Sequence, residues 1–229
     1  MPMPAAAKLT RRQSTPFVPT DGYEQLFFLD NVDWKTYVTI TDALAERNIQ
    51  ITYDRGRLEF MSVSGKHERR KSLLGYLVEV LTEEFELPMQ GVGSMTCKNE
   101  RVARGLESDD SWYIESLPKV IDKEDIDLEV DPPPDLAVEI DVSRRSINRL
   151  GVYEGLRIPQ VWRYDGKTLK VYLLSAEGKY NEFEKSPTFP GIPIAGIVEF
   201  LQQGAAADHN AIKKSFRQWV RKQRRKKKK

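Results

Sequence analysis

An alternating stretch in the middle of the chain, PDLAVEIDV at residues 134–142, constrains the fold more than any other part of the sequence. The even-numbered residues 136 to 142 are apolar and share one face of a strand, because successive side chains point to opposite faces. Asp135, Glu139 and Asp141 lie on the other face. Buried carboxylates are costly without partners. We therefore expect a strand with one face in a core and an acidic face that opens into a cleft.

A second acidic strand is predicted earlier in the chain, in LESDDSWYI at residues 106–114. Glu107 and Asp109 share one face of it. If the two strands pair, an Asp from one and a Glu from the other converge, and such a pair suits a divalent ion that can activate a water. The alternative is that these acids form the solvated face of a sheet, with Asp135 marking only the strand start.

The flanking segments predict a mixed α/β fold. Apolar residues recur at helical spacing in 67–87, and Asp165-Gly166 between two apolar runs is typical of a β-hairpin. We expect one central sheet flanked by helices, with an N-terminal helix and a β-hairpin before the long helix. The predicted helices are 33–47, 67–87, 145–156, 194–203 and 210–222; the predicted strands lie in 51–61, 89–98, 106–114, 135–142, 158–174 and 179–186; residues 117–134 are predicted to be a loop.

The chain of 229 residues divides into three predicted segments. Residues 1–20 are expected to be a flexible leader, 21–220 a single domain, and 221–229 a basic tail. The tail holds eight of the 36 Lys and Arg residues; the remaining 28 stand against 34 acidic residues, so the rest of the chain carries about −6. Such a tail can bind nucleic acid or simply stay solvated. Its candidate contacts to nucleic acid are Arg221, Lys222, Arg224, Arg225 and Lys226.

Cysteine and histidine usage narrows the metal chemistry. Cys97 is the only cysteine and there are two histidines, so an internal disulfide is excluded and a thiolate or histidine-rich zinc site is disfavoured. A metal would be held by carboxylates, which favours Mg²⁺ or Mn²⁺. The single cysteine, expected to be buried and inert, fits a reducing compartment, so we expect a cytoplasmic protein. No apolar run is long enough to predict a membrane span.

Five stretches, in order, resemble the Uma2 (DUF820) family of restriction endonucleases, a branch of the PD-(D/E)XK nuclease superfamily. They are RGRLEFMSVSGKHE, GVGSMT, LESDDSWYI, PDLAVEID with RLGVYEGLRIPQVWRYD, and FPGIPI, and the similarity covers roughly residues 20–220. The resemblance implies a restriction-endonuclease-like fold, DNA as substrate and Mg²⁺ (or Mn²⁺) as cofactor. By analogy with nucleases of this fold, a homodimer is also expected.

The resemblance also implies a catalytic set. Asp109 and Glu139 stand at the positions of the two metal-binding acids. The Lys of the usual motif would stand at residue 141, which here is Asp141. In Uma2-like sequences the basic residue comes from the next helix, four residues before its Tyr; counting back from Tyr153 gives Arg149. Arginine keeps its proton and cannot act as a general base, so Arg149 is expected to act as an electrostatic clamp.

Four further residues are weighed as supporting groups. His67 matches the family's histidine before the long helix, and it could line the cleft or simply bond a loop. Glu68 could reach the metal. Asp141 could support Glu139, whose face it shares, and Tyr153 shares a helix face with Arg149 and is expected to pack.

Two functions of different classes follow. The first is a Mg²⁺-dependent endonuclease that hydrolyses DNA phosphodiester bonds through metal-activated water. The alternative is a catalytically inactive nucleic-acid-binding or interaction protein that retains the nuclease fold, which the arginine at 149 and the basic tail motivate. A carboxylate pair acting on sugars is a third possibility, without an aromatic sugar platform to support it.

Overall fold

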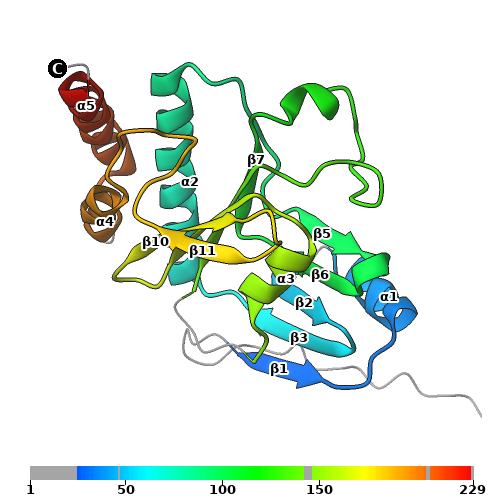
Figure 1. Cartoon of the computed structure of the whole chain (residues 1–229). Coiled ribbons are helices and arrows are strands. Elements are labelled where there is room, and N and C mark those ends of the chain that lie inside the picture. Colours follow the sequence, from blue (N-terminus) through cyan, green and yellow to red (C-terminus); the bar gives the residue numbers. More distant parts are fainter. Residues whose placement is uncertain (1–24, 46, 142–145, 205–206, 228–229) are drawn as a thin grey trace, which may run out of the picture.

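The chain folds around two β-sheets. In the computed structural model, the described residues are 25–45, 47–141, 146–204 and 207–227, so the predicted leader lies outside them. One sheet has five strands in the order β1-β3-β2-β6-β5, and the other has six in the order β11-β10-β9-β8-β7-β4 (Figure 1). The predicted mixed α/β class is confirmed, and the strands are divided between two sheets rather than gathered in one.

The helices and strands follow the chain in a simple order. The helices are α1 (Trp34–Leu44), α2 (Gly65–Phe85), α3 (Arg149–Gly155), α4 (Ile194–Gln203) and α5 (His209–Lys227). The strands of the five-stranded sheet are β1 (Leu26–Leu29), β2 (Ile49–Asp54), β3 (Arg57–Ser62), β5 (Thr96–Asn99) and β6 (Arg104–Glu107). Those of the six-stranded sheet are β4 (Gln90–Gly91), β7 (Asp110–Tyr113), β8 (Leu136–Ile140), β9 (Gln160–Tyr164), β10 (Leu169–Leu174) and β11 (Tyr180–Phe183).

The first predicted hairpin is formed by β2 and β3. Asp54 is opposite Arg57 in the antiparallel register, and the two residues between them, Arg55 and Gly56, have φ of 49° and 96°. Positive φ at both central residues is what a tight type I′ hairpin turn requires, and glycine adopts it without steric cost.

Two stretches predicted as single strands each divide between the two sheets. Residues 89–98 contribute β4 to the six-stranded sheet and β5 to the five-stranded sheet. Residues 106–114 end β6 at Glu107 and begin β7 at Asp110, so Ser108 and Asp109 are the crossing between the sheets. The chain therefore places Asp109 at the junction of the two sheets.

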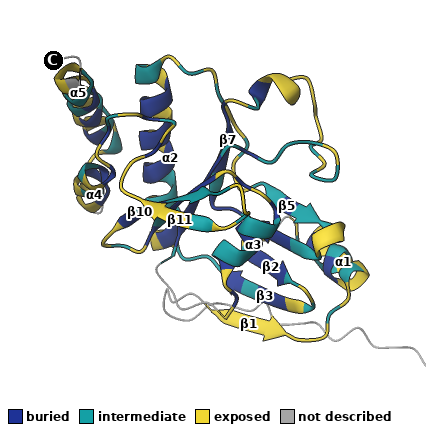
Figure 2. Cartoon of the chain, viewed as in Figure 1, coloured by how far each residue is buried: buried dark blue, intermediate teal, exposed yellow. Residues whose placement is uncertain are grey.

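The alternation predicted for β8 is confirmed. Leu136, Val138 and Ile140 belong to the main hydrophobic core, which includes many residues of α2. Ala137, of the opposite parity, packs in a second core with Val152 and Tyr153 of α3. All five residues of β8 are buried. The prediction that the acidic face opens into a cleft is wrong, because α3 covers that face and Glu139 is buried. Figure 2 colours β7 and parts of α2 as buried.

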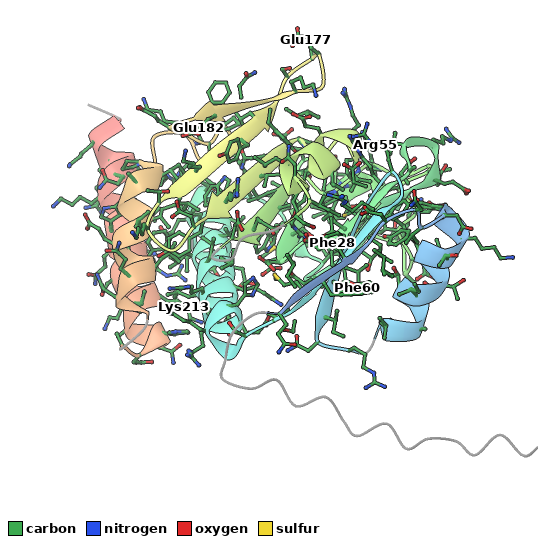
Figure 3. All side chains as sticks on the ribbon, turned by 90° about the horizontal axis from the view of Figure 1, so that it is seen from below. Phe28, Arg55, Phe60, Glu177, Glu182 and Lys213 are labelled. Carbon is green, nitrogen blue, oxygen red and sulfur yellow. The ribbon has the colours of Figure 1, made fainter. Side chains whose placement is uncertain are left out.

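Helices α2, α4 and α5 lie side by side and form one end of the molecule (Figures 1 and 3). Ile212, Phe216 and Val220 of α5 join the main core. Lys213 on the same helix, labelled in Figure 3, stands 3.9 Å from the ring centroid of Tyr76 on α2. Within the described residues, no helix combines the length and apolarity needed to cross a membrane.

Candidate active site

Asp109 is held at the junction of the sheets by donors from three elements. It is fully buried, and its Oδ2 accepts from the backbone N–H of Ile140 at 2.5 Å. The side-chain amide of Gln50, on β2, donates to its Oδ1. Nε2 of His67, at the start of α2, lies 3.3 Å from Oδ2. The carboxylate therefore links the five-stranded sheet, the six-stranded sheet and α2.

The surroundings of His67 indicate which ring nitrogen carries a proton. Its Nε2 lies 3.1 Å from the carbonyl oxygen of Ile140 and 3.3 Å from the Asp109 carboxylate. Both neighbours are acceptors, so Nε2–H is the donor. His67 is fully buried. Two roles were weighed for His67, lining the cleft and bonding a loop. In the structure its side chain contacts the Asp109 carboxylate and the carbonyl oxygen at the end of β8.

The electrostatic surroundings keep Asp109 ionised. Burial is the largest single effect and raises the pKa of this carboxyl, but the contact with His67, the charge of Arg149 and the N–H of Ile140 together outweigh it. The net result is a pKa below the ordinary aspartate value.

Glu139 is paired with Arg149 in a fork. Arg149 Nε is 2.6 Å from Glu139 Oε1, and Nη2 donates to Oε2 at 2.7 Å. The hydroxyl of Tyr153 donates to the same Oε2 at 2.8 Å. Burial and then the charge of Glu139 hold the pKa of Tyr153 well above its usual value, so it stays a donor. The predicted packing role of Tyr153 therefore includes orienting Glu139.

Arg149 also crosses to the other sheet. Its Nη1 donates to Thr52 Oγ1 at 2.6 Å, and its Nη2 donates to the carbonyl oxygen of Glu107 at 2.6 Å. Burial lowers the pKa of Arg149, but the charges of Glu139 and Asp109 and the hydrogen bond to Glu139 raise it above its already high value. The guanidinium is therefore permanently charged, and the charges of both predicted metal-binding acids act on it.

Asp141 contacts the neighbouring strand β9. It forms an ion pair with Arg163, and its backbone N–H donates to Tyr164 O at 2.9 Å. Arg163 is the residue of β9 in register with Glu139. At the position where the usual motif has lysine, the chain has an acid that is neutralised by the neighbouring strand.

A polar cavity of about 270 Å³ borders the cluster on the side of α1 and β2. Gln50, Glu68, Lys71, Ser94 and Glu107 are among the residues that line it. Gln50 donates to the Asp109 side chain, and Ser94 Oγ donates to the Asp109 carbonyl oxygen at 3.1 Å. Glu68, predicted as a supporting acid, pairs with Lys71 at 3.2 Å. Two residues that line the cavity, Gln50 and Ser94, therefore contact Asp109 directly.

Three buried polar residues of this region were not predicted from the sequence: Gln50, Thr52 and Glu59. Glu59 of β3 is 1% exposed, and its Oε2 accepts from Ser146 N at 2.7 Å, Ser146 Oγ at 2.6 Å and Ile147 N at 3.1 Å. These bonds anchor the segment that leads into α3 and so to Arg149. An acid within a hairpin strand looks like a solvated residue, and its burial depends on a segment far along the chain.

The described residues of the basic tail do not line the polar cavity of this site. Residues Arg221 to Lys227 continue α5, and Arg221 Nε pairs with Glu84 Oε2 of α2 at 2.8 Å. Arg224 stands 4.6 Å from the ring centroid of Phe85. Glu84 is 17 residues from His67 along α2, which is about 25 Å at 1.5 Å per residue. Arg221 and Arg224 therefore lie at the end of α2 opposite to the one at which His67 contacts Asp109.

The chain was compared with known proteins. The family model Uma2, described as "Putative restriction endonuclease", matches residues 34–200. A solved structure of a putative nuclease belonging to DUF820 from Anabaena variabilis ATCC 29413 is similar at 14% identity and a TM-score of 0.44, over 67% of this chain and 90% of that one. No curated protein matches. Since the family model spans well over half of its residues, this chain belongs to the Uma2 family.

Proposed function

We propose that this protein is an endonuclease that hydrolyses DNA phosphodiester bonds with Mg²⁺ or Mn²⁺, and that Asp109, Glu139 and Arg149 form its catalytic centre. The observation that carries the proposal is the convergence of two buried acids and a permanently charged guanidinium at the sheet junction, beside a polar cavity. Membership of a family described as restriction endonucleases supports the same reading.

The donor set fits a hard divalent ion. Asp109 and Glu139 offer carboxylate oxygens, and Asp109 is ionised because its pKa is lowered. Mg²⁺ is commonly held by one or two carboxylates, with waters and substrate phosphates completing its shell. Two acids therefore suffice, although no group of three or more His, Cys, Asp or Glu side chains in the described part of the chain is placed to hold a metal. A bound ion would supply activation of water and neutralisation of phosphate charge.

The neighbouring side chains would position and balance these acids. Arg149 keeps its proton, so it neutralises negative charge on Glu139 or on a phosphate and takes no part as a base. Tyr153 holds Glu139 by a hydrogen bond, and His67 holds Asp109. Gln50 is the group between Asp109 and the cavity, so its amide has to yield or share Asp109 Oδ1 when an ion or substrate enters.

Nicking of supercoiled plasmid in Mg²⁺ or Mn²⁺ tests the proposal. The test variant is Asp109→Asn/Glu139→Gln, which keeps side-chain volume, with circular dichroism to confirm folding. Glu182→Gln is the matched control, because Glu182 is exposed and pairs with Lys170 on β10, away from the cluster. We expect divalent-dependent nicking by the wild type and the control, and a loss of at least about 100-fold in the double variant, as for removal of an essential catalytic group. Nicking that persists in the folded double variant would refute the assignment. Linear product would indicate that both strands are cut, as expected of a homodimer.

The rival function is nucleic-acid binding without cleavage. It is favoured by one observation: all four oxygens of the two acids contact protein groups in a buried network, namely Gln50, Ile140 and His67 for Asp109, and Arg149 and Tyr153 for Glu139. DNA binding by the wild type, with no divalent-dependent nicking, would support this rival and contradict the nuclease proposal.

A further inference from the structure

A second cavity, of about 250 Å³, lies on the other side of the start of α2. It is lined by Lys66, Arg69, Arg70, Leu73 and Tyr164, together with residues at the end of α4 and in the turn after β9. No acidic residue is found among the described residues that line it. We name the cavity with Lys66, Arg69 and Arg70 the cationic pocket.

The three cations have no acidic partner within the described part of the chain: no ion pair involves Lys66, Arg69 or Arg70 there. By contrast, most arginines elsewhere are paired, including Arg149, Arg163, Arg217 and Arg221. Three neighbouring cations repel one another. In a chain body with an excess of acids, this arrangement is typical of a site whose partner is an anion from outside.

Helix geometry places the cationic pocket next to the candidate active site. Residues 66, 69, 70 and 73 share one face of α2, and each successive residue turns by about 100°. Consecutive residues therefore reach three different places: Lys66 lines the cationic pocket, His67 contacts Asp109, and Glu68 lines the polar cavity. The first turn of α2 is thus a ridge with a cavity on each side and the acidic cluster beneath it.

The spacing suits a nucleic-acid backbone. A helix with its side chains is about 10–12 Å across, and one strand of a duplex carries a phosphate about every 3.4 Å of helix axis. A strand that crosses the ridge would therefore present one phosphate to the cationic pocket while a neighbouring part of the same strand lies at the polar cavity. A pocket of about 250 Å³ holds a phosphate with part of its sugar, since sites for whole small molecules are mostly larger, at about 300–1,000 Å³.

The lining residues favour a duplex over a single strand. Proteins that bind single strands stack the bases on exposed aromatic side chains. Tyr164 is the one aromatic residue among the described residues of the two cavities, and it is 2% exposed. Contacts available to a nucleic acid here are therefore to phosphate and sugar, which is how a duplex is held without reading its sequence.

We propose that the cationic pocket binds a backbone phosphate of a double-stranded nucleic acid, on the strand whose phosphodiester bond is presented to the polar cavity. The inference rests on the proposed function for the position of that bond. The pocket itself can be tested without any cleavage.

The experiment measures fluorescence anisotropy of a labelled duplex, in EDTA, over a series of salt concentrations. The test variant is Lys66→Gln/Arg69→Gln/Arg70→Gln. The matched control, Lys35→Gln/Lys119→Gln/Lys185→Gln, removes the same charge from exposed residues outside both cavities. Each phosphate contact contributes about 0.9 to the slope of log K against log salt concentration. We expect the slope of the test variant to fall by about 0.9, as for the loss of one phosphate contact, and its affinity at low salt to fall by about tenfold, with the control close to the wild type.

Further arms keep the result decisive. Arg69→Lys/Arg70→Lys should retain the wild-type slope, since it retains the charge, and the wild type should bind the duplex more tightly than either single strand. Equal losses in the test and control variants, or a preference for the single strand, would overturn the proposal. A third outcome would also overturn it: inorganic phosphate protects the pocket arginines from chemical modification, and the test variant keeps its affinity for the duplex. That outcome would identify a site for small anions. Plasmid nicking by Asp109→Asn/Glu139→Gln, measured separately, reports on the proposed function alone.

Discussion

Replacing Arg149 by methionine tests whether the buried fork holds the candidate site together. The change removes the cation that faces Glu139 at 2.6 and 2.7 Å, and with it the bonds to Thr52 and to the Glu107 carbonyl oxygen. Removing one partner of a buried ion pair costs about 3–5 kcal/mol, because the other charge stays buried. We therefore expect the free energy of unfolding to fall by about 4 kcal/mol, a large share of the about 5–15 kcal/mol that stabilises a typical domain.

Urea denaturation of a double-mutant cycle measures this effect. Arg149→Met, Glu139→Gln and the double variant are compared with the wild type, and Arg149→Lys tests the fork, since lysine keeps the charge but not the planar donors. We expect the double variant to be more stable than the sum of the single losses predicts, by about 2 kcal/mol or more. A loss below about 1 kcal/mol in Arg149→Met, or strict additivity in the cycle, would refute the reading of a strong buried pair.

Two further predictions concern acids outside that pair, the half-buried Asp110 and the buried Glu59. Burial raises the pKa of Asp110 from 3.8 to about 6, so the folded state disfavours the ionised carboxyl. The stability that the protonated carboxyl contributes is fully present below pH 3.8 and is lost as the pH rises through about 6. Asp110→Asn should therefore stabilise the protein above pH 6, by about 1–2 kcal/mol after allowance for its partial exposure, and a gain in urea denaturation that is independent of pH would contradict this. Glu59→Gln should cost about 1–3 kcal/mol and lower plasmid nicking, because the bonds to Ser146 and Ile147 that lead into α3 are weakened; unchanged nicking would show that this anchor does not position Arg149.

Much of the fold could be predicted because its signals are local. The long helix α2, the hairpins of β2 with β3 and of β9 with β10, and the two faces of β8 all follow from side-chain period and turn residues. The predicted strands 89–98 and 106–114 were incomplete, since each one supplies two strands in different sheets. A strand pattern shows which residues alternate but not which partner each half finds.

The candidate site could be predicted in part for the same reason. Glu139 lies on the strand, Arg149 follows ten residues later, and Tyr153 follows one helical turn after that, so their meeting is a short-range consequence of strand, loop and helix. Asp141 was weighed as a support for Glu139 from shared strand parity, and the structure adds that it pairs with Arg163 of the adjacent strand, which the sequence did not predict. Sequence parity carries no information about the neighbouring strand's side chains.

The sequence by itself determined the long helix α2, the two hairpins, the alternation of β8 and the family, because these depend on residues within a few positions of each other or on ordered motifs. Only the tertiary structure decided the partners of the site. Gln50 reaches Asp109 across 59 residues of chain, and Arg149 reaches Thr52 across 97. It also decided that Lys66, His67 and Glu68 face a cationic pocket, the acidic cluster and a polar cavity. The physical reason is that the partner of a buried charge is set by the packing of distant segments, which local periodicity does not encode.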